Sequence, residues 1–333
     1  MRILIATDAW SPQTNGVVST LRHTITHLQR AGHLVETTTP DQFPSVACPG
    51  YGEVRLAIGA GSGIREQLER LRPEAIHIAT EGPIGFAVRA QCRRQGLVFT
   101  TSYHTQFPEY LRKRVPVPVG LSYALLRRFH GAARCCMVST TSMQRQLEGR
   151  GFRNLVRWRR GVDASLFRPR DKQFPGLSRP IAAYVGRLAV EKNLDAFLSM
   201  RWQGSKLVIG DGPERLRLEH AYPGAHFVGY QHGEDLARHM AAADVMVFPS
   251  LTDTFGLVNL EAMACGVPVA AFPVTGPVDV IRDGETGALD WDLAAAAQRA
   301  LRASPARCRA FAETHGWAGC TAEFMANLAH SGL

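Results

Sequence analysis

SLTDTFGLVNLEAMACGVPV, the stretch at residues 250–269, places one carboxylate, Asp253, in a predicted loop and another, Glu261, inside a predicted helix that begins at Gly256. The first backbone N–H groups of a helix are unpaired and carry partial positive charge, so the Gly256 end suits an anion such as a diphosphate. A carboxylate accepts hydrogen bonds from hydroxyls but repels phosphate. The stretch therefore predicts a site for a sugar-bearing diphosphate.

This stretch resembles the acidic-x7-acidic signature of the family-4 retaining glycosyltransferases. Asp253 stands where most members have glutamate, which keeps the charge on a shorter side chain. The resemblance implies the GT-B fold, an α/β architecture in which two Rossmann-like domains, each with a doubly wound parallel sheet, face a central cleft. It also implies that Asp253 contacts the 3- or 4-hydroxyl of the donor hexose and that Glu261 binds the ribose hydroxyls. The donor-binding residues expected between them are Thr254, Phe255, Gly256 and Leu257.

The length of the chain exceeds what one ordinary core accommodates. Its 333 residues, 45% of them hydrophobic, suit two domains of roughly 150 residues each. The seven cysteines are odd in number and form no C-x-x-C pair, which argues against a disulfide framework or a zinc site and favours a reducing, cytoplasmic compartment. We find no signal-peptide pattern and no apolar run near the roughly 18 residues of a membrane span, so we expect a protein that is not integral to a membrane.

Short β-branched runs alternate with helical stretches, which is typical of βαβ units around parallel sheets. Strands are predicted at 3–7, 75–79, 98–102 and 136–139, and then at 181–185, 207–209, 244–248 and 267–271. The proline-rich stretch at 167–180 is the predicted linker, because proline interrupts both strand ladders and helices. We expect an acceptor-binding domain at 1–165, a nucleotide-sugar-binding domain at 166–316, and a helix at 317–333 that, by the family resemblance, crosses back onto the first domain.

Two cations follow the first predicted strand of the second domain, in the sequence YVGRLAVEKN at residues 184–193. Arg187 offers a planar fork for phosphate oxygens and Lys192 a mobile point charge, which together suit a diphosphate leaving group. Their spacing resembles the R-x4-K pair of the family, whereas Lys192 taken alone would be an ordinary surface lysine. We predict both as catalytic residues, with Asp253 as a third and Gly186 at the donor.

Further candidate residues follow other predicted strands. Asn15 and Gly16 precede a predicted helix and are expected at the donor phosphates, and Gly210 and Gly212 are expected near the nucleotide base. The motif TSYHTQ, residues 101–106, follows a strand, at whose carboxyl end open α/β folds bind ligands. By resemblance, His104 lies beside the donor sugar as a catalytic residue, although a lone histidine is as often structural. Acceptor or interdomain contacts are expected from Asp8, Tyr103, Thr105 and Asp163.

Two other patterns imitate functional sites. Asp290-Trp291-Asp292 has the form of a metal-binding DxD, but Asp292 directly precedes an alanine-rich helix and is more simply its N-cap. Residues 59–64, GAGSGI, lack the last glycine of a dinucleotide fingerprint, which disfavours a dehydrogenase. We expect no metal and no cofactor, with the donor, GDP-mannose or a UDP-hexose, as a cosubstrate.

Basic residues are concentrated in the first half of the chain. Residues 1–165 carry 22 Lys and Arg against 11 Asp and Glu, a net +11, whereas the remainder carries 16 against 18. Apolar and aromatic side chains are interspersed in the basic stretch from Arg112 to Arg160, and this mixture suits peripheral contact with an anionic membrane. We therefore expect a cytoplasmic enzyme that can bind the inner face of the cytoplasmic membrane. A solvated basic face is the alternative. We expect no nucleic-acid partner, because no zinc-finger, RRM or helix-turn-helix signature accompanies the charge.

The motifs together predict a retaining hexosyltransferase that moves mannose, glucose or glucuronate from a nucleotide sugar to a lipid or glycan acceptor. The loop sequences resemble bacterial GDP-mannose-dependent α-mannosyltransferases and related enzymes of glycolipid biosynthesis. The resemblance implies front-face transfer, in which the leaving phosphate takes the proton of the acceptor. An epimerase of the same fold acting on UDP-N-acetylglucosamine, and a non-catalytic nucleotide-sugar-binding protein, remain as alternatives.

Overall fold

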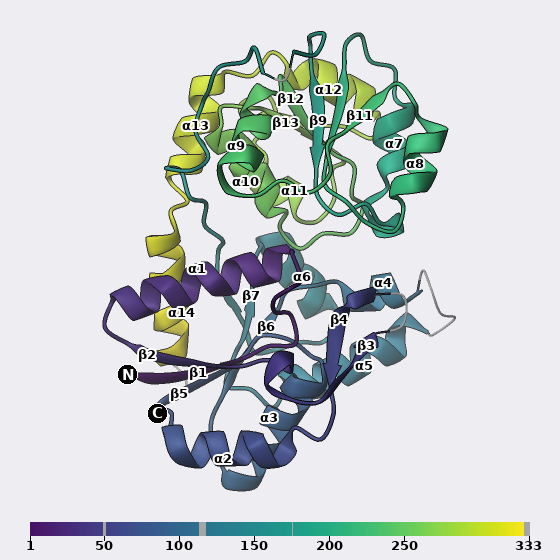
Figure 1. Cartoon of the computed structure of the whole chain (residues 1–333). Helices are drawn as coiled ribbons and strands as arrows, with labels where there is room; N and C mark the ends of the chain where they lie inside the picture. Colours follow the sequence, from purple (N-terminus) through teal and green to yellow (C-terminus); the bar gives the residue numbers. More distant parts are fainter. Residues whose placement is uncertain (49–50, 113–117, 175, 330–333) are drawn as a thin grey trace. The chain divides into compact units, whose positions relative to one another are not determined.

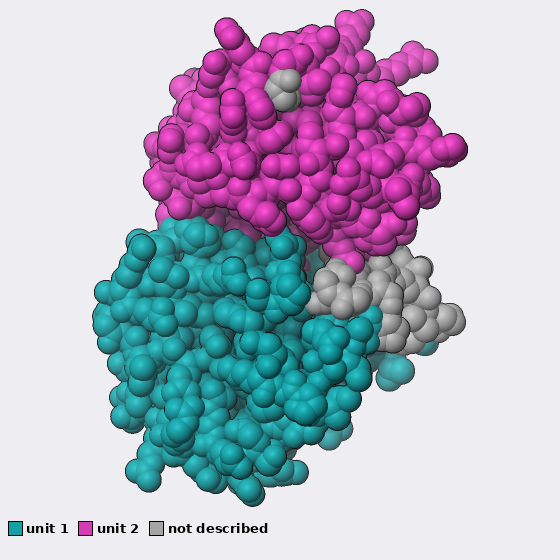
Figure 2. Space-filling view, viewed as in Figure 1, with its two compact units in different colours: residues 1–159, 317–333 teal, residues 160–316 magenta. Residues whose placement is uncertain are grey.

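The computed structural model describes residues 1–48, 51–112, 118–174 and 176–329. The chain divides into two compact units: unit 1 comprises 1–159 and 317–333, and unit 2 comprises 160–316 (Figure 2). The first boundary therefore falls between Arg159 and Arg160 rather than at the predicted 165/166. The hydrogen bond from the Val162 amide to the His315 carbonyl, 2.8 Å long, gives the reason, because it joins the start of unit 2 to its end.

Unit 1 is built on a six-stranded sheet with strand order β2-β1-β5-β6-β7-β8, in which all neighbours are parallel (Figure 1). The strands are β1 (Arg2–Ala6), β2 (Leu34–Thr38), β5 (Ala75–Ile78), β6 (Thr100–Tyr103), β7 (Cys136–Val138) and β8 (Leu155–Arg157). A separate antiparallel pair, β3 (Ser45–Cys48) and β4 (Tyr51–Ala57), precedes β5. The helices are α1 (Gly16–Arg30), α2 (Gly61–Leu71), α3 (Pro83–Gln95), α4 (Phe107–Arg112), α5 (Val119–His130) and α6 (Thr141–Gly149), joined by the final α14 (Trp317–Ala329).

Helices cover both faces of this sheet, because successive strand residues point to opposite sides. Ile76 and Ile78 of β5 pack with apolar residues of α2 and α3 on one face. His77, between them, points to the other face, where its ring meets those of Phe324 at 4.9 Å and Trp158 at 5.9 Å. Phe324 belongs to α14, which packs beside α1. The C-terminal helix thus completes the core of unit 1.

Hydrogen bonds fasten α14 to the end of β8 and to the residue after it, just before the chain passes from unit 1 to unit 2. The Trp158 indole nitrogen donates to the Cys320 carbonyl at 3.1 Å, and the Asn327 amide donates to the Arg157 carbonyl at 2.8 Å. Trp158 and Phe324 are both fully buried. Burying two large aromatic rings at this contact contributes strongly to the stability of unit 1.

Unit 2 repeats the plan with a six-stranded parallel sheet in the order β11-β10-β9-β12-β13-β14. The strands are β9 (Ala182–Val185), β10 (Lys206–Ile209), β11 (Ala225–Phe227), β12 (Val245–Phe248), β13 (Val269–Ala271) and β14 (Gly287–Leu289). The helices are α7 (Leu194–Ser199), α8 (Arg215–Ala221), α9 (Gly233–Ala242), α10 (Leu257–Ala264), α11 (Pro277–Val280), α12 (Leu293–Ala300) and α13 (Pro305–Glu313).

Two cores sandwich the sheet of unit 2. Ala183 and Val185 of β9 pack with residues of α9, α10 and α13, whereas Ala182 and Tyr184 pack with residues of α7, α8 and α12. This alternation along one strand confirms a sheet buried on both faces, as parallel sheets require. Asp292 caps α12 by accepting from the amides of Ala294 and Ala295, as predicted from its position before the alanines.

The proline-rich stretch at 167–180 is not the linker that the sequence predicts. The Phe167 side chain is buried in the core of unit 2, and its carbonyl accepts a 2.6 Å hydrogen bond from the Arg309 guanidinium. Arg179 donates to the Ala242 carbonyl at 3.2 Å. Proline removes regular structure from this segment, but side-chain hydrogen bonds replace the missing ladder and hold it against unit 2.

Candidate functional site

The predicted donor-binding residues of unit 2 lie at one edge of its sheet. Gly186 and Arg187 follow β9, Gly210 follows β10, and the loop containing Asp253 follows β12. Because all these strands are parallel, their carboxyl ends share an edge, which is where open α/β sheets bind ligands. Residues that are up to 67 positions apart in the sequence, Gly186 and Asp253 among them, are thereby brought to the same side of the unit.

The structure brings Lys192 and Asp253 into direct contact. Lys192 Nζ lies 2.9 Å from Asp253 Oδ2, and the two side chains retain 24% and 17% of their exposure. Lys192 ends a short 3₁₀ turn, after which Asn193 adopts a left-handed conformation with φ of 56°. The Asn193 side-chain amide donates to the Pro249 carbonyl at 3.1 Å, so this residue ties the lysine turn to the end of β12.

The loop after Asp253 ends in the helix start that the sequence predicts. Gly256 is the N-cap of α10 with φ of 78°, a conformation that favours glycine. A side chain at this position would also collide with the Asn259 amide, 2.5 Å from an ideal Cβ. The helix is apolar and mostly buried. The Asn259 N–H donates to the Gly256 carbonyl at 3.0 Å, whereas the N–H groups of Leu257 and Val258 come before the first carbonyl that the helix can offer them. These groups are the anion-binding feature expected at Gly256.

Glu261 lies in the middle of α10, about one turn from its start. Burial raises the pKa of its carboxyl to about 7. A carboxyl group in this state changes its charge near neutral pH, and once ionised it can only accept hydrogen bonds. It is therefore suited to a ligand that supplies hydroxyl donors, as the predicted ribose contact requires.

Tyr184 holds the turn that carries Arg187, and the sequence analysis did not single it out. The hydroxyl of this buried tyrosine donates to the Arg187 carbonyl at 2.8 Å. Burial raises the pKa of the Tyr184 phenol, so the hydroxyl remains a donor at neutral pH. The signal in the sequence is weak, because an aromatic residue in a strand usually indicates core packing alone.

The glycines after β9 and β10 are required by close backbone approach. A Cβ on Gly210 would lie 1.9 Å from the Gly186 carbonyl oxygen, and one on Gly212 would lie 2.3 Å from the Leu188 carbonyl oxygen. The Leu188 amide also donates to the Asp211 carbonyl at 2.8 Å. The two loops therefore support each other. The expected contact of Gly210 and Gly212 with the nucleotide base remains a prediction.

Asp8 of unit 1 caps a helix, a role that the sequence did not indicate. Its carboxylate accepts hydrogen bonds from Thr80 Oγ1 at 2.8 Å and from the amides of Gly82, Ile84 and Gly85 at 3.1, 2.8 and 3.3 Å. These amides open α3, where negative charge is favourable. Because the side chain is buried and holds these donors, Asp8 shapes the loop after β1, and its expected contact with the acceptor remains a prediction.

Asn15 and Gly16 lie at the start of α1, as predicted. Asn15 Oδ1 accepts from the amides of Val17 and Val18, both at 3.0 Å, so the side chain caps its own helix. Gly16 is exposed. Because the Asn15 side chain is used as a cap, the predicted contact with the donor phosphates would come from the exposed backbone of this segment. That contact remains a prediction.

Tyr103 ends β6, and His104 and Thr105 follow it at the carboxyl edge of the first sheet. The Tyr103 side chain is fully buried among Tyr123, Phe152 and neighbouring core residues, and its expected contact with the acceptor remains a prediction. His104 is also mostly buried, and its ring meets the Trp158 ring edge-on at 5.7 Å. Thr105 is half-buried. His104 and Thr105 remain candidates.

Asp163 belongs to unit 2 and lies a few residues after the chain leaves unit 1 at Arg159. Its Oδ1 accepts from the Ser165 hydroxyl at 2.6 Å and from the amides of Ser165 and Leu166 at 3.0 and 3.2 Å. These bonds form an Asx turn within the segment itself. The expected acceptor or interdomain contact of Asp163 remains a prediction.

A buried ion pair in unit 1 escaped the sequence analysis. His130 Nε2 lies 2.9 Å from Glu81 Oε1, and His130 Nδ1 lies 2.9 Å from Thr101 Oγ1. Burial disfavours the histidine cation, but Cys136 and Glu81 beside it raise the pKa of His130 above its ordinary value. His130 and Glu81 are 49 residues apart, so no local motif connects them.

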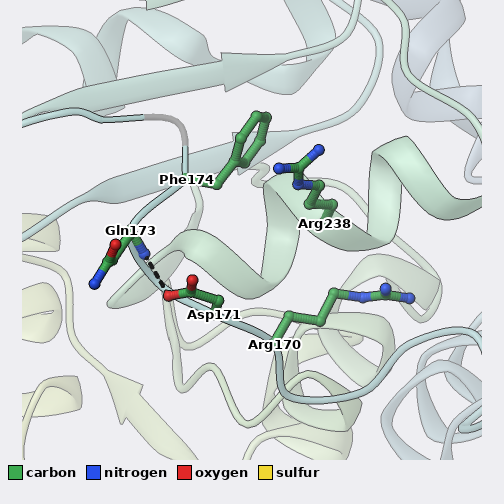
Figure 3. A pocket seen from close by; sticks show the side chains of 5 residues that line it. All are labelled: Arg170, Asp171, Gln173, Phe174 and Arg238. Carbon is green, nitrogen blue, oxygen red and sulfur yellow. Dashed lines mark hydrogen bonds between the residues drawn. The ribbon is translucent and has the colours of Figure 1, made fainter.

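A cavity of about 460 Å³ lies elsewhere on unit 2, between the segment at 170–174 and α9 (Figure 3). The Arg238 guanidinium sits over the Phe174 ring at 4.0 Å from its centroid. Arg170, Asp171 and Gln173 complete the lining. None of the predicted site residues lines this cavity, so we assign the candidate site to the sheet edge instead.

Comparisons with known proteins agree with the geometry. Residues 14–166 match the model of Glycosyltransferase Family 4, and residues 179–304 match that of Glycosyl transferases group 1. A "GDP-mannose-dependent alpha-mannosyltransferase" of Mycobacterium tuberculosis (strain CDC 1551 / Oshkosh) is 30% identical over 317 residues, covering 87% of this chain and 83% of the relative. A "GDP-mannose-dependent alpha-(1-6)-phosphatidylinositol dimannoside mannosyltransferase" of the same strain is 25% identical, with 98% and 96% covered.

Among solved structures, sucrose-phosphate synthase from Thermosynechococcus elongatus superimposes with a TM-score of 0.81 at 23% identity, with 98% of each chain covered. This likeness extends over nearly the whole chain. Together with the two parallel sheets, it confirms the predicted α/β fold of GT-B type.

We predict that Glu261→Gln removes a pH dependence from the stability of unit 2. Because burial raises the pKa of Glu261 from 4.5 to about 7, the protonated form is favoured in the folded state. Its stabilising contribution is complete below about pH 4.5 and is lost as pH rises through 7, by at most about 3 kcal/mol. Urea unfolding between pH 5 and 8 should show this decline in the wild type and a flatter profile in the variant; parallel profiles would show that Glu261 does not titrate as described.

Proposed function

The chain belongs to glycosyltransferase family 4, and from that premise we propose that it transfers mannose from GDP-mannose, with retention of configuration, to a lipid-linked or glycan acceptor. The observation that carries the donor site is the combination of Lys192, the turn of Arg187 and the start of α10 at one sheet edge. The names of the mycobacterial relatives support mannose, and one of them supports a glycolipid acceptor. UDP-glucose and UDP-glucuronate are the alternative donors.

The proposed mechanism follows from where charge develops. Departure of the nucleoside diphosphate places negative charge on the β-phosphate and positive charge on the sugar ring. Arg187, Lys192 and the first amides of α10 stabilise the phosphate, and such preorganised donors usually supply the largest part of a rate enhancement. Asp253 and Glu261 accept hydrogen bonds from hexose and ribose hydroxyls. The proposed mechanism uses only these side chains and backbone amides and gives no role to a metal ion or a cofactor.

A panel of sugar nucleotides tests this function, with release of nucleoside diphosphate and product analysis as the readouts. We expect GDP-mannose to be consumed and the mannose to appear on an acceptor. Consumption of donor alone with isomerisation of the sugar would instead identify an epimerase. Binding without consumption would identify a nucleotide-sugar-binding protein.

With the accepted donor, Arg187→Ala should lower kcat about a hundredfold, equivalent to roughly 3 kcal/mol, because one charged contact to the leaving group is lost. The matched control is Arg217→Ala, which removes an arginine that pairs with Asp195 and Glu214 on the surface of the same unit. This control should turn over like the wild type. Wild-type turnover in Arg187→Ala would refute the leaving-group assignment.

We also propose that unit 1 contacts anionic membranes through α5. Leu121 and Leu125 lie one turn apart on this helix and are 66% and 53% exposed, with Arg128 exposed at the next turn. Exposed leucines beside arginines match a surface of acyl chains and anionic headgroups. Lys113, Arg114 and Val117 of the predicted basic stretch lie outside the described residues. Among the described residues, no helix combines the length and apolarity that crossing a bilayer demands.

Vesicle flotation tests this contact. The wild type should float with vesicles that contain anionic lipid and much less with neutral ones, and Leu121→Ser combined with Leu125→Ser should weaken flotation several-fold. Leu216→Ser is the control, because Leu216 is 81% exposed on unit 2 and does not belong to the basic stretch of the sequence. Equal recovery of the protein with neutral and anionic vesicles would point to a soluble glycan acceptor.

A further inference from the structure

The carboxylate of Asp253 holds a set of donors that an anionic ligand would also use. Its Oδ2 lies 2.9 Å from Lys192 Nζ, and its Oδ1 accepts from the amides of Thr254 at 2.9 Å and Phe255 at 3.4 Å. One cation and two neighbouring backbone N–H groups therefore converge on a single acidic side chain. This arrangement has the composition of an anion site that the protein fills with its own residue.

The same groups belong to the donor site of the proposed function, and the inference rests on that function. There, Lys192 binds the leaving phosphate, and the loop at 254–257 binds the donor. Phosphate oxygens and an ionised carboxylate both accept hydrogen bonds and both carry negative charge, so they compete for one cation. Sugar hydroxyls differ, because they can donate hydrogen bonds to a carboxylate.

We propose that Asp253 competes within the molecule with the phosphate of the ligand for Lys192, and that hexose hydroxyls draw it away. An intact sugar nucleotide then supplies hydroxyls for Asp253 and phosphate for Lys192 at once. A free nucleoside diphosphate, the product of transfer, supplies only phosphate and has to displace the carboxylate. Asp253 therefore makes the site prefer substrate over product and assists product release.

Unpaired polar atoms around the loop provide a second, independent observation. The Ser250 hydroxyl and both side-chain amide atoms of Asn259 are buried and have no hydrogen-bond partner among the described residues. The Asn259 amide lies directly beneath Gly256, where α10 begins. Buried polar groups are almost always paired, so the loop between Ser250 and Gly256 is expected to have a second arrangement that satisfies these atoms. Movement of Asp253 away from Lys192 provides one.

Asp253→Asn is the direct test, because asparagine keeps an oxygen that can accept from the Thr254 and Phe255 amides but loses the charge that attracts Lys192. Calorimetry with GDP and with UDP, on the full chain without sugar, should show about five- to tenfold tighter binding in this variant. The affinity for the accepted sugar nucleotide should not rise in parallel, so the preference for substrate over product should shrink.

Two controls isolate the effect. Asp195→Asn also removes a carboxylate from a cation in unit 2, here Arg217 at 2.7 Å, and should leave both affinities unchanged. In a Lys192→Gln background, Asp253→Asn should tighten nucleoside diphosphate binding much less, because the contested cation is absent and only the repulsion between carboxylate and phosphate is relieved. Melting curves establish that each variant is folded before binding is measured.

The outcomes separate this inference from the function on which it rests. Tighter diphosphate binding in Asp253→Asn that is largely lost in the Lys192→Gln background supports the competition, and an equal gain in both backgrounds overturns it. Unchanged or weaker diphosphate binding in a folded Asp253→Asn protein overturns it, while sugar transfer by the unmodified protein leaves the proposed function standing. If the wild type binds neither nucleoside diphosphate nor sugar nucleotide, the proposed function and the inference both fail.

Discussion

The start of α10 is the constraint on which the candidate site depends. This apolar helix begins with a left-handed turn at Gly256, and its first two residues, Leu257 and Val258, are half-buried, whereas Asn259 and Leu260 are fully buried. Helix and loop are held from several sides. Arg309 of α13 donates to the Ala264 carbonyl at 2.8 Å near the end of α10. Gly276 packs closely against the loop, since a Cβ added to it would lie 3.2 Å from the Phe255 amide nitrogen. The packing therefore presents the amides before any ligand arrives, which is the condition for electrostatic preorganisation.

The cationic part of the site depends on local devices of a different kind. The Tyr184 hydroxyl fixes the carbonyl of Arg187, and Asn193 links the turn of Lys192 to Pro249. Both contacts join a side chain to the backbone, so they position the turns and leave the cationic groups adaptable. The close approach of the loops at Gly186 and Gly210 then permits no side chain between them. Together these features explain why this sheet edge contains so many glycines.

Local patterns in the sequence predicted most of the fold. Each predicted strand appears in the structure, shifted at its ends by no more than two residues, because buried parallel strands read as short β-branched runs. The four strands at the sheet margins were missed, because β8, β11 and β14 are only three residues long and β2 has a polar second half. The linker was misplaced for a physical reason. Proline indicates an absence of regular structure, and the buried Phe167 shows that an irregular segment can still be part of a core.

For the candidate site too, local motifs identified residues but not their contacts in the folded chain. Motifs located Lys192, Asp253 and Gly256, which lie where glycine or charge is locally required. They could not show that Lys192 and Asp253 meet, because that pairing spans 61 residues and depends on the order of strands. Asp8 and Tyr103 were expected at the acceptor because their loops follow predicted strands and resemble loops of the family. The structure adds that their side chains cap a helix and fill the core, because position at the end of a strand does not determine the direction of a side chain.

A crystal structure with bound GDP or UDP tests the central claim most directly. The account predicts that the β-phosphate lies within about 3 Å of Lys192 Nζ and of the first amides of α10, with the ribose hydroxyls at Glu261. Nucleotide bound elsewhere, for example in the cavity beside Phe174 and Arg238, with the start of α10 unoccupied, would contradict it.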